Sequence, residues 1–426
     1  MSVLTYSRTI PVKYDTDIVV LGGGIAGIAC ALTCAKMNAR VMLIERSSLL
    51  GGNATIGGVA NFCGNTIGQG YAFDTIVSAL EEFDAIRPVV KGTDTRVFNH
   101  VILASLLPEL LIRHGVKFLL HASLVDAVLT GPHIDHVIVD GPSGLFAISA
   151  KQFIDCTGDG FAARRCGFAT MKGGDSGYQL PMSYMYFVKH VTPEQKRNEV
   201  APGWFPEIST KEQLPMTSIW PDGFNANAVK IKVPMFDSTD TESLTLAEVA
   251  ARRKMMSVLD YHQRVENRNY AINHGSPVIG IREGYRIKGD YILTVDDLRA
   301  GRSFDDAIAV GTYYLDGHKP DDDKRTYILD PKDLAVPPYD IPLRSIIAKD
   351  GENLLMAGRC LSADQLALSS ARVMTTCAMM GSAAAAAASL AVRKNCDVRS
   401  VDIHEIQGEL LSQGAILDKA KIREIY

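Results

Sequence analysis

Three closely spaced glycines near the N-terminus have the spacing of a phosphate-binding turn. Gly22, Gly24 and Gly27 form the pattern G-x-G-x-x-G, and an acidic residue, Glu45, follows eighteen residues after the last of them. In such a pattern the first glycine permits a tight turn, the second lets backbone approach a pyrophosphate, and the third lets a helix pack closely on a sheet. The acid accepts hydrogen bonds from a ribose hydroxyl. These residues therefore predict that the chain binds a dinucleotide.

The segments around the glycines have the hydrophobic patterns that such a site requires. Residues 18–21 form a short apolar run typical of a buried parallel strand, and residues 25–37 carry apolar side chains at helical spacing. A second apolar run, residues 41–44, ends at Glu45. The N-terminus of the predicted helix would offer free N–H groups and a positive dipole to the pyrophosphate. A strand, a turn and a helix in this order make the motif much more specific than the glycines alone.

A second glycine pair, Gly51-Gly52, lies shortly after Glu45. A plain nicotinamide-dinucleotide domain continues from this strand into an ordinary helix. A glycine pair would instead let backbone amides approach the far side of the pyrophosphate and the ribityl chain of an extended FAD. Short β segments between residues 116 and 155 then lead to the sequence Thr157-Gly158-Asp159-Gly160. We interpret these features as favouring FAD over NAD.

Several arginines further along the chain could bind a substrate. Arg282 and Arg286 lie four residues apart, and a guanidinium group is suited to a bidentate grip on a carboxylate. The alternative is a structural ion pair with Glu283 or Asp290. Arg372 opens a late helix, where either a substrate or catalytic role or simple helix-start packing fits. Weaker candidates, each more simply explained by packing or by a surface position, are Cys63, His190, His274, His318, Tyr291, Tyr313 and Tyr314.

Composition and charge exclude several classes of function. The chain has 426 residues, 47% of them hydrophobic and 22% charged, which suits two domains or one large domain with an insertion. A formal net charge of −4 gives no electrostatic basis for nucleic-acid binding. The eight cysteines form no C-x-x-C pair, so we expect no disulfide framework, no metal site and a cytoplasmic location. No secretory signal is visible at the N-terminus.

One uncharged stretch, residues 373–392, is long enough to cross a membrane. Its bulk is an alanine run, residues 383–388, and alanine forms helices well but partitions poorly into lipid. We therefore expect a buried core helix and no membrane span.

Local signals predict three further helices. One begins at Asp74 with Val77, Leu80 and Phe83 facing inward, and a second begins after Asn99, which is a good cap residue. Thr294 and Asp297 form a capping box for a third helix, which Gly301 ends.

Together these patterns predict an α/β fold. We expect a Rossmann-like FAD-binding domain, made of a parallel sheet plus a β-meander, with an inserted α+β substrate domain. Residues 1–160 would form the first part of the FAD-binding domain, and residues 161–340, which are rich in proline between 181 and 234, the substrate domain. Residues 341–426 would complete the FAD-binding domain with C-terminal helices.

Five segments carry a resemblance to a known family: DIVVLGGGIAGIACA, LIERSSLLGGNATIGG, FIDCTGDGFAA, GIREGYRIKGDYILTVDDLRAGRSFDDAIAVGTY and IPLRSIIAKDGENLLMAGRCLSADQLALSSARVMTTCAMMG. They extend from about residue 15 to 390 and so cover most of the chain. The chain resembles the FAD-dependent oxidoreductases of the glutathione-reductase-type flavoprotein superfamily. More distantly, it is similar to the flavoprotein subunits of fumarate reductase and succinate dehydrogenase.

The resemblance implies a role for each matching position. The first glycines, Glu45 and the residues after it would hold the ADP half, and Asp159 would close over the nucleotide. Gly358 and Arg359 would lie by the ribityl chain, although relatives of glutathione reductase commonly have aspartate where Arg359 stands. The amides near Val373 would stabilise negative charge on the reduced flavin. The full set of residues predicted to bind FAD is Gly22, Gly24, Ile25, Ala26, Gly27, Glu45, Arg46, Gly52, Asn53, Ala54, Gly57, Gly58, Leu124, Thr157, Gly158, Asp159, Gly358, Arg359 and Val373.

The resulting functional prediction is an FAD-dependent oxidoreductase that moves a hydride between flavin and a small organic, carboxylated substrate. Arg282, Arg286 and Arg372 are its predicted catalytic residues. No second nicotinamide-binding unit is visible, so the electron acceptor stays open, and a homo-oligomer is allowed. The alternatives are a non-redox flavoprotein, such as a hydratase or isomerase, and a catalytically silent FAD-binding protein.

Overall fold

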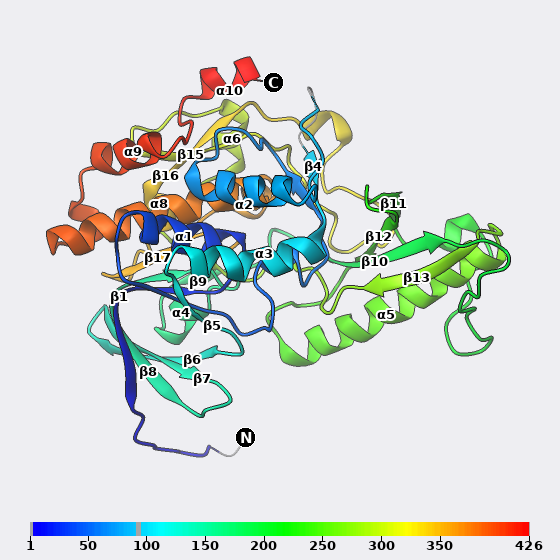
Figure 1. Ribbon diagram of the computed structural model, residues 1–426, viewed down its shortest axis with the longest axis horizontal. Coiled ribbons are helices and arrows are strands. Elements are labelled where there is room, and N and C mark those ends of the chain that lie inside the picture. The colour runs from blue at the N-terminus through cyan, green and yellow to red at the C-terminus, as the bar shows by residue number, and fades with distance from the viewer. Residues whose placement is uncertain (1–2, 91–94, 426) are drawn as a thin grey trace.

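The glycine motifs lie along the edge of a seven-stranded sheet in the computed structural model, which describes residues 3–90 and 95–425 (Figure 1). The strand order is β5-β2-β1-β8-β7-β6, and β17 also pairs with β8. The strands are β1 (Val12–Leu21), β2 (Val41–Ile44), β5 (Lys117–Leu119), β6 (Ser123–Thr130), β7 (His133–Asp140), β8 (Phe146–Asp155) and β17 (Leu354–Met356).

The sheet combines a parallel half with an antiparallel meander. Strand β1 runs parallel to β2 and β8, whereas β7 is antiparallel to both β8 and β6. Along β8, the first residues pair with β7 and the last residues, from Phe153 to Asp155, pair in parallel with β17. This parallel sheet with a β-meander confirms the predicted α/β, Rossmann-like fold class.

Strand β1 is longer than its hydrophobic run. The apolar residues 18–21 pair with residues 41–44, as the sequence predicts, but the strand begins at Val12. Val12 is more than half exposed and pairs with Ala147 of β8. Long-range pairing therefore sets the start of this strand, which hydrophobic patterning could not reveal.

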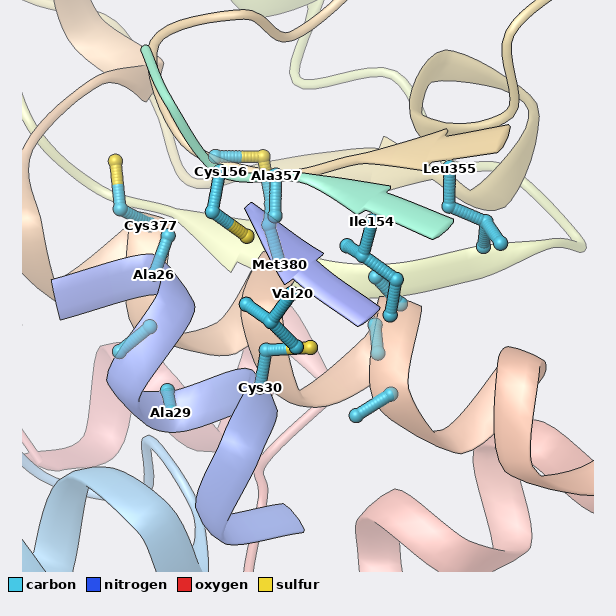
Figure 2. Packing of buried hydrophobic residues seen from close by; sticks show 14 of the residues in the cluster. Val20, Ala26, Ala29, Cys30, Ile154, Cys156, Leu355, Ala357, Cys377 and Met380 are labelled. Atoms are coloured by element: carbon cyan, nitrogen blue, oxygen red, sulfur yellow. The ribbon is translucent and has the colours of Figure 1, made fainter. Parts of the chain in front are cut away.

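Two helices, α1 (Ile25–Lys36) and α8 (Met374–Lys394), pack against each other beneath the sheet. Small residues allow the approach, since a Cβ on Gly381 would lie 2.1 Å from the carbonyl oxygen of Ala26. The Thr33 hydroxyl donates to Ser382 Oγ at 3.1 Å. Figure 2 shows Ala26 and Ala29 of α1 near Val20 of β1.

Helix α8 is long and apolar enough to cross a membrane by length and composition. Nearly all of it is buried inside the protein, including the whole alanine run at 383–388. Burial of this kind is typical of a core helix, as the sequence predicts.

A second sheet of four antiparallel strands has the order β11-β12-β10-β13. One of its faces packs on the long helix α5, and residues such as Tyr186, Val229 and Ile231 form a separate hydrophobic cluster there (Figure 1). The opposite face carries Met185, which packs with Ala60 of the glycine-rich loop, residues 51–70. The elements are β10 (Met182–His190), β11 (Thr217–Pro221), β12 (Asn227–Val233), β13 (Tyr270–Gly275) and α5 (Thr241–Arg264).

The hydrophobic clusters group the chain somewhat differently from the predicted domain boundaries at 160 and 340. The cluster of the second sheet contains residues between 182 and 281. Residues from Ile287 to Ile341 belong to the large cluster around the first sheet. The predicted boundaries stay a prediction, and these clusters give the packing against which to judge them.

The remaining elements lie outside these two sheets. The helices are α2 (Tyr71–Glu82), α3 (His100–Arg113), α4 (Phe161–Arg165), α6 (Val295–Ala300), α7 (Gln365–Ala371), α9 (Ile403–Ser412) and α10 (Lys419–Ile425). The remaining strands are β3 (Asn61–Cys63), β4 (Thr95–Val97), β9 (Thr170–Met171), β14 (Arg286–Ile287), β15 (Ala307–Gly311) and β16 (Tyr339–Pro342).

Most of the local helix signals are confirmed. Asn99 caps α3 by accepting the N–H groups of Val101 and Ile102, and Thr294 and Asp297 form the capping box of α6. Phe83 is an exception, because it is 60% exposed although the sequence predicts it to face inward. It stands at the C-cap of α2, beyond the last turn that packs on the core.

Candidate functional site

The first glycine turn is tightly packed by protein at two positions and open at the third. Gly22 has φ 103°, and a Cβ there would lie 2.6 Å from the carbonyl oxygen of Cys156. A Cβ on Gly27 would lie 1.9 Å from the carbonyl oxygen of Gly22. A Cβ on Gly24 would meet none of the described atoms within 4 Å. Gly22 and Gly27 therefore shape the turn, while Gly24 borders free space at the start of α1.

Two helix N-termini at this site lack side-chain caps. Neither Gly24, which precedes α1, nor Val373, which precedes α8, provides a side-chain hydrogen bond to the first turn. Helices α3 and α5, in contrast, are capped by Asn99 and Asp240. The first N–H groups of α1 and α8 are thus left for other acceptors, which is the arrangement that an anionic or electron-rich ligand group requires.

The second glycine pair lies directly against the first turn. Gly51 and Gly52 both have positive φ, and Gly51 forms a parallel bridge with Gly24. A Cβ on Gly52 would lie 3.1 Å from the Cα of Gly24. Glu45, at the end of β2, accepts the N–H of Gly23 at 2.7 Å and so fixes the turn from the other side. The two glycine clusters and the acid form one continuous surface.

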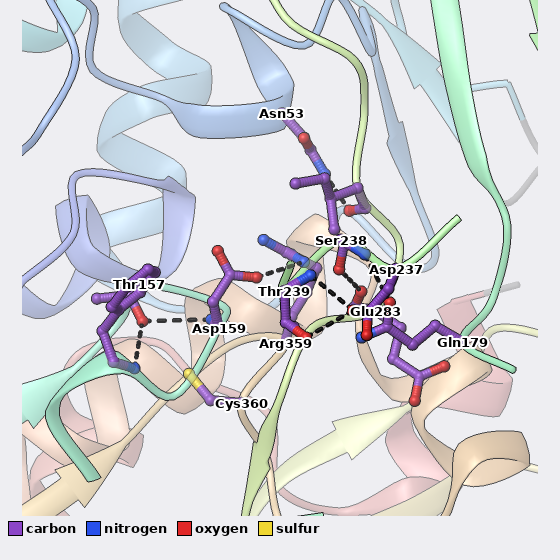
Figure 3. Close-up of polar contacts among 12 residues, drawn as sticks. Asn53, Thr157, Asp159, Gln179, Asp237, Ser238, Thr239, Glu283, Arg359 and Cys360 are labelled. Carbon is purple, nitrogen blue, oxygen red and sulfur yellow. Dashed lines mark hydrogen bonds and ion pairs between the residues drawn. The ribbon is translucent and has the colours of Figure 1, made fainter. Parts of the chain in front are cut away.

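The Thr157–Gly160 turn holds a carboxylate between two arginines. Asp159 Oδ1 lies 3.5 Å from Arg359 Nη1 (Figure 3). Asp159 Oδ2 lies 3.8 Å from Arg46 Nη2. A Cβ on Gly158 would lie 2.5 Å from Arg359 Nη2, so the guanidinium group covers this turn. Two cations thus face one carboxylate at this turn.

The remaining predicted FAD residues occupy the same region or its borders. Asn53 Nδ2 donates to the carbonyl oxygen of Ile281 at 2.9 Å and so ties the glycine loop to the segment that carries Arg282. A Cβ on Gly58 would lie 2.0 Å from Ser276 Oγ, at the end of the second sheet. Leu124 lies on β6, opposite Val139. Ile25, Ala26 and Ala54 are buried, in the first turn of α1 and at the second glycine pair, and Gly358 has φ 86° beside Ala26.

Of the three predicted catalytic arginines, Arg286 is enclosed by protein. It is 2% exposed, its Nη2 lies 3.3 Å from Glu283 Oε1, and its Nη1 donates to the carbonyl oxygen of Ala363 at 3.0 Å. Glu283 in turn accepts hydrogen bonds from Gly173, Leu180 and Gln365. These contacts favour the structural ion pair that the sequence leaves open. They give Arg286 no free donor pair for a substrate.

Arg282 has a different environment. Its Nη1 donates to the carbonyl oxygen of Pro181 at 2.9 Å and to Ser183 Oγ at 2.6 Å, and it forms no ion pair within residues 3–90 and 95–425. Burial lowers the pKa of Arg282 to about 10, although Asp316 acts in the opposite direction. The guanidinium is therefore a partly buried cation with donors to spare.

Arg372 belongs to a buried polar cluster with Asp316 and His318. Arg372 Nη2 lies 2.9 Å from Asp316 Oδ2, and His318 Nε2 lies 3.0 Å from Asp316 Oδ1. Burial would raise the pKa of Asp316, but the hydrogen bond from His318 and the charge of Arg372 lower it below its ordinary value. Burial and then the charge of Arg282 lower the pKa of His318 to about 3. The pair is thus an ionised carboxylate beside a neutral imidazole.

The weaker candidates divide into two groups. Cys63 and the rings of Tyr313 and Tyr314, which are tilted against each other with centroids 4.3 Å apart, lie near Asp316. Burial raises the pKa of the Cys63 thiol to about 11, which makes it a poor nucleophile at neutral pH. Away from this cluster, the His190 ring packs at a tilt against Tyr270, His274 pairs with His100, and Tyr291 donates to Asp297.

Comparison with known proteins decides the family. A family model described as "FAD dependent oxidoreductase" matches residues 17–410. The chain belongs to this family. FAD is accordingly its cofactor, and the open space at Gly24, the uncapped helices and the two arginines beside Asp159 fit an extended dinucleotide.

Individual relatives match only in part. A probable electron transfer flavoprotein-quinone oxidoreductase of Escherichia coli is 48% identical over 44 residues, which is 10% of each chain. Thiamine thiazole synthase 4 of Physcomitrium patens is 29% identical over 129 residues, which cover 30% of this chain and 35% of that protein. The chain therefore matches between a tenth and about a third of the length of these relatives.

Among solved structures, a geranylgeranyl bacteriochlorophyll reductase-like protein from Thermoplasma acidophilum covers 96% of this chain and 90% of its own, with a TM-score of 0.50 and 12% identity. At this identity the likeness shows the fold alone. The two proteins therefore share a fold over nearly the whole of this chain.

Two residues of the polar cluster are absent from the predicted set. Lys230 lies on β12 within the sequence VKIKV, where the alternation places both lysines on one face and the apolar residues on the other. That alternation was a usable signal. Asp316, in contrast, follows β15 in a segment without periodicity, and only the tertiary contact with Arg372 reveals it.

Proposed function

We propose that this FAD dependent oxidoreductase moves a hydride between flavin and a small organic substrate that carries a carboxylate. The observation that carries the proposal is the state of Arg282, a partly buried guanidinium with no ion pair among the described residues. Removing a cation from water without a counter-charge is costly, and a substrate carboxylate would supply the missing charge. The link from Asn53 to Ile281 sets this arginine beside the glycine loop.

The proposed position of FAD follows from the glycine turns. The diphosphate would lie on the N–H groups that open α1, with the ribose hydroxyls at Glu45 and with Arg46 and Arg359 nearby. The flavin ring would lie toward Val373 and the start of α8, whose N–H groups favour negative charge. When bound, FAD supplies the hydride chemistry. This placement is what membership of the glutathione-reductase-type superfamily, with distant similarity to fumarate reductase, implies.

Arg372 and His318 would complete the site. Asp316 holds the guanidinium of Arg372 in place, and Arg372 Nε has no partner in the described part of the chain. His318 Nδ1 also lacks a partner, while Nε2 faces Asp316. A neutral imidazole whose Nε2–H is directed at a carboxylate leaves Nδ1 to accept a hydrogen bond from the substrate, and so would orient it for hydride transfer.

Two further parts of the proposal concern the setting of the enzyme. All eight cysteines are free thiols, which supports a reducing, cytoplasmic location. We also propose a separate electron acceptor, since the sequence shows no second nucleotide-binding unit. A homo-oligomer is compatible with the proposal.

Anaerobic mixing with a panel of carboxylated alcohols, amines and alkanes tests the proposal. A true substrate will bleach the flavin absorbance, and Arg282→Met will weaken its apparent affinity about 10- to 100-fold, the value of a charged hydrogen bond. The matched control is Arg253→Met, because Arg253 is exposed on α5. Equal effects of the two substitutions would count against a substrate role for Arg282.

The same experiment separates the alternatives. A hydratase or isomerase would convert its substrate with no net change in flavin absorbance. A silent FAD-binding protein would keep its flavin oxidised with every donor and would convert none of them.

A further inference from the structure

Lys230 is a cation without a partner beside the proposed substrate site. It lies in the middle of β12, opposite Met185 of β10, on the sheet face that turns away from α5. Its ammonium group forms no hydrogen bond or ion pair with any residue in the described ranges, and the side chain is only partly buried. Lys232, two residues further on, instead donates to the carbonyl oxygen of Arg325 at 2.7 Å.

Charged and titratable groups from four segments surround Lys230. Arg282, Asp316, Arg372 and Cys63 all act on its ammonium group. Burial, followed by the positive charge of Arg282, lowers the pKa of Lys230 to about 8, whereas Asp316 acts in the opposite direction. Arg282 Nη1 donates to Ser183 Oγ at 2.6 Å, and Ser183 stands two residues before Met185, the residue opposite Lys230, on the same sheet face. Arg282 and Lys230 are therefore neighbours on this face of the second sheet.

The charges of Lys230 and these neighbours do not balance. Arg282, Arg372 and Lys230 are cations, Asp316 is the carboxylate that faces them, and His318 is neutral at physiological pH. Two positive charges therefore lack a counter-charge. Partly buried cations that outnumber the carboxylate facing them are suited to bind an anionic ligand.

We propose that this cluster binds a small organic dianion, and that Lys230 provides the cation that distinguishes a dianion from a monoanion. The inference deepens the proposed function and rests on it, because Arg282 would hold one anionic group of the same substrate. The second anionic group, a carboxylate or a phosphate, would lie against Lys230.

Binding of a dianion has a consequence that does not depend on turnover. A nearby negative charge favours the protonated amine, so binding at a pH above the pKa of free Lys230 draws a proton onto it. The neighbouring groups compete little, because the pKa of Cys63 is about 11, that of Arg282 is about 10 and that of His318 is about 3. Burial and then the charge of Arg282 also lower the pKa of Lys232 to about 8, so Lys232 titrates in the same range. Loss of the proton uptake in Lys230→Arg therefore assigns the uptake to Lys230.

The test is calorimetric titration of the FAD-loaded protein with malonate, inorganic phosphate and acetate, at about pH 9 in buffers of different ionisation enthalpy. Malonate or phosphate will bind at least about 10-fold more tightly than acetate, with uptake of about one proton. Tighter binding of malonate would assign the substrate as a dicarboxylate, and tighter binding of phosphate would assign it as a phosphate ester. Lys230→Arg will keep the preference without proton uptake, and Lys230→Met will lose the preference. Lys189→Met, at the exposed end of β10, is the control and will change neither.

Three results would overturn the inference. The first is equal affinity for acetate and malonate, and the second is proton uptake that persists in Lys230→Arg. The third is a Lys230→Met protein that binds malonate normally but has a shifted flavin reduction potential, which would show that the charge of Lys230 acts on the flavin. The two proposals also fail separately. If a donor bleaches the flavin but malonate does not bind, only the dianion proposal fails. If malonate binds but no donor bleaches the flavin, only the redox proposal fails.

Discussion

The carboxylate of Asp316 holds the guanidinium of Arg372 at 2.9 Å, one residue before the N-cap of the helix at whose start the flavin is proposed to lie. The other carboxylate oxygen faces His318 at 3.0 Å. A single side chain thus orients both a cation and an imidazole. The arrangement makes Asp316 a positioning residue, which acts on the site through Arg372 and His318.

Asp316→Asn keeps the shape of the side chain and removes its charge. We expect kcat/KM to fall by about 10- to 100-fold, because Arg372 and His318 lose the group that orients them. FAD content, measured by absorbance, should stay unchanged. A loss of FAD equal to the loss of activity would show that the residue supports the fold rather than the site.

The pH dependence of stability should also report on Asp316. Its pKa is lower in the folded protein than the ordinary value of 3.8. Its charge therefore contributes stability that is fully present above about pH 4 and is lost as the pH falls through the folded pKa. The difference in unfolding free energy between the natural protein and Asp316→Asn should be constant near neutrality and should shrink in acid. A constant difference down to acid pH would contradict the lowered pKa.

Two glycines of one motif should give opposite phenotypes. Gly24→Val places a side chain in space that the protein leaves open, so we expect a normal melting temperature for the FAD-free protein and less than about a tenth of the normal FAD content. Gly27→Ala drives a methyl group against the carbonyl oxygen of Gly22 and should lower the melting temperature itself. Thermal melts of both FAD-free proteins, with FAD measured separately, distinguish the two effects.

Substitutions of Arg286 and Arg282 should also have different effects, one on stability and the other on substrate binding. Arg286→Met leaves Glu283 buried without its ion-pair partner, and we expect a loss of about 3 kcal/mol in unfolding free energy. Arg282→Met removes a partly buried cation that has no counter-charge, so stability should change by less than about 1 kcal/mol while the substrate KM rises. Denaturant unfolding of both variants gives the comparison. A larger loss for Arg282→Met would assign it the structural role.

Much of the nucleotide half could be predicted because its signals are local. The glycine spacing, the strand at 41–44 and the acid at Glu45 each follow from backbone geometry or from hydrophobic periodicity within a few residues. The burial of α8 inside the protein also follows from its composition. The start of β1 at Val12 and the exposure of Phe83 do not, because tertiary pairing and helix termination decide them.

The polar cluster could be predicted only in part. Arg282 and Arg286 look equivalent in sequence, and only the three-dimensional contacts of Glu283 separate a structural arginine from a free one. Asp316 and Arg372 lie 56 residues apart, so no local pattern joins them. Lys230 is intermediate, since strand alternation gives its face but not its neighbours.

The central claim is that FAD lies with its diphosphate at the start of α1 and its flavin ring at the start of α8. An experimental structure of the FAD-loaded protein tests this most directly. We predict diphosphate oxygens within hydrogen-bond distance of the backbone N–H groups that follow Gly24, and the flavin pyrimidine edge against the N–H groups that follow Val373. A diphosphate bound elsewhere, or a flavin ring directed away from α8 and Arg282, would contradict the account.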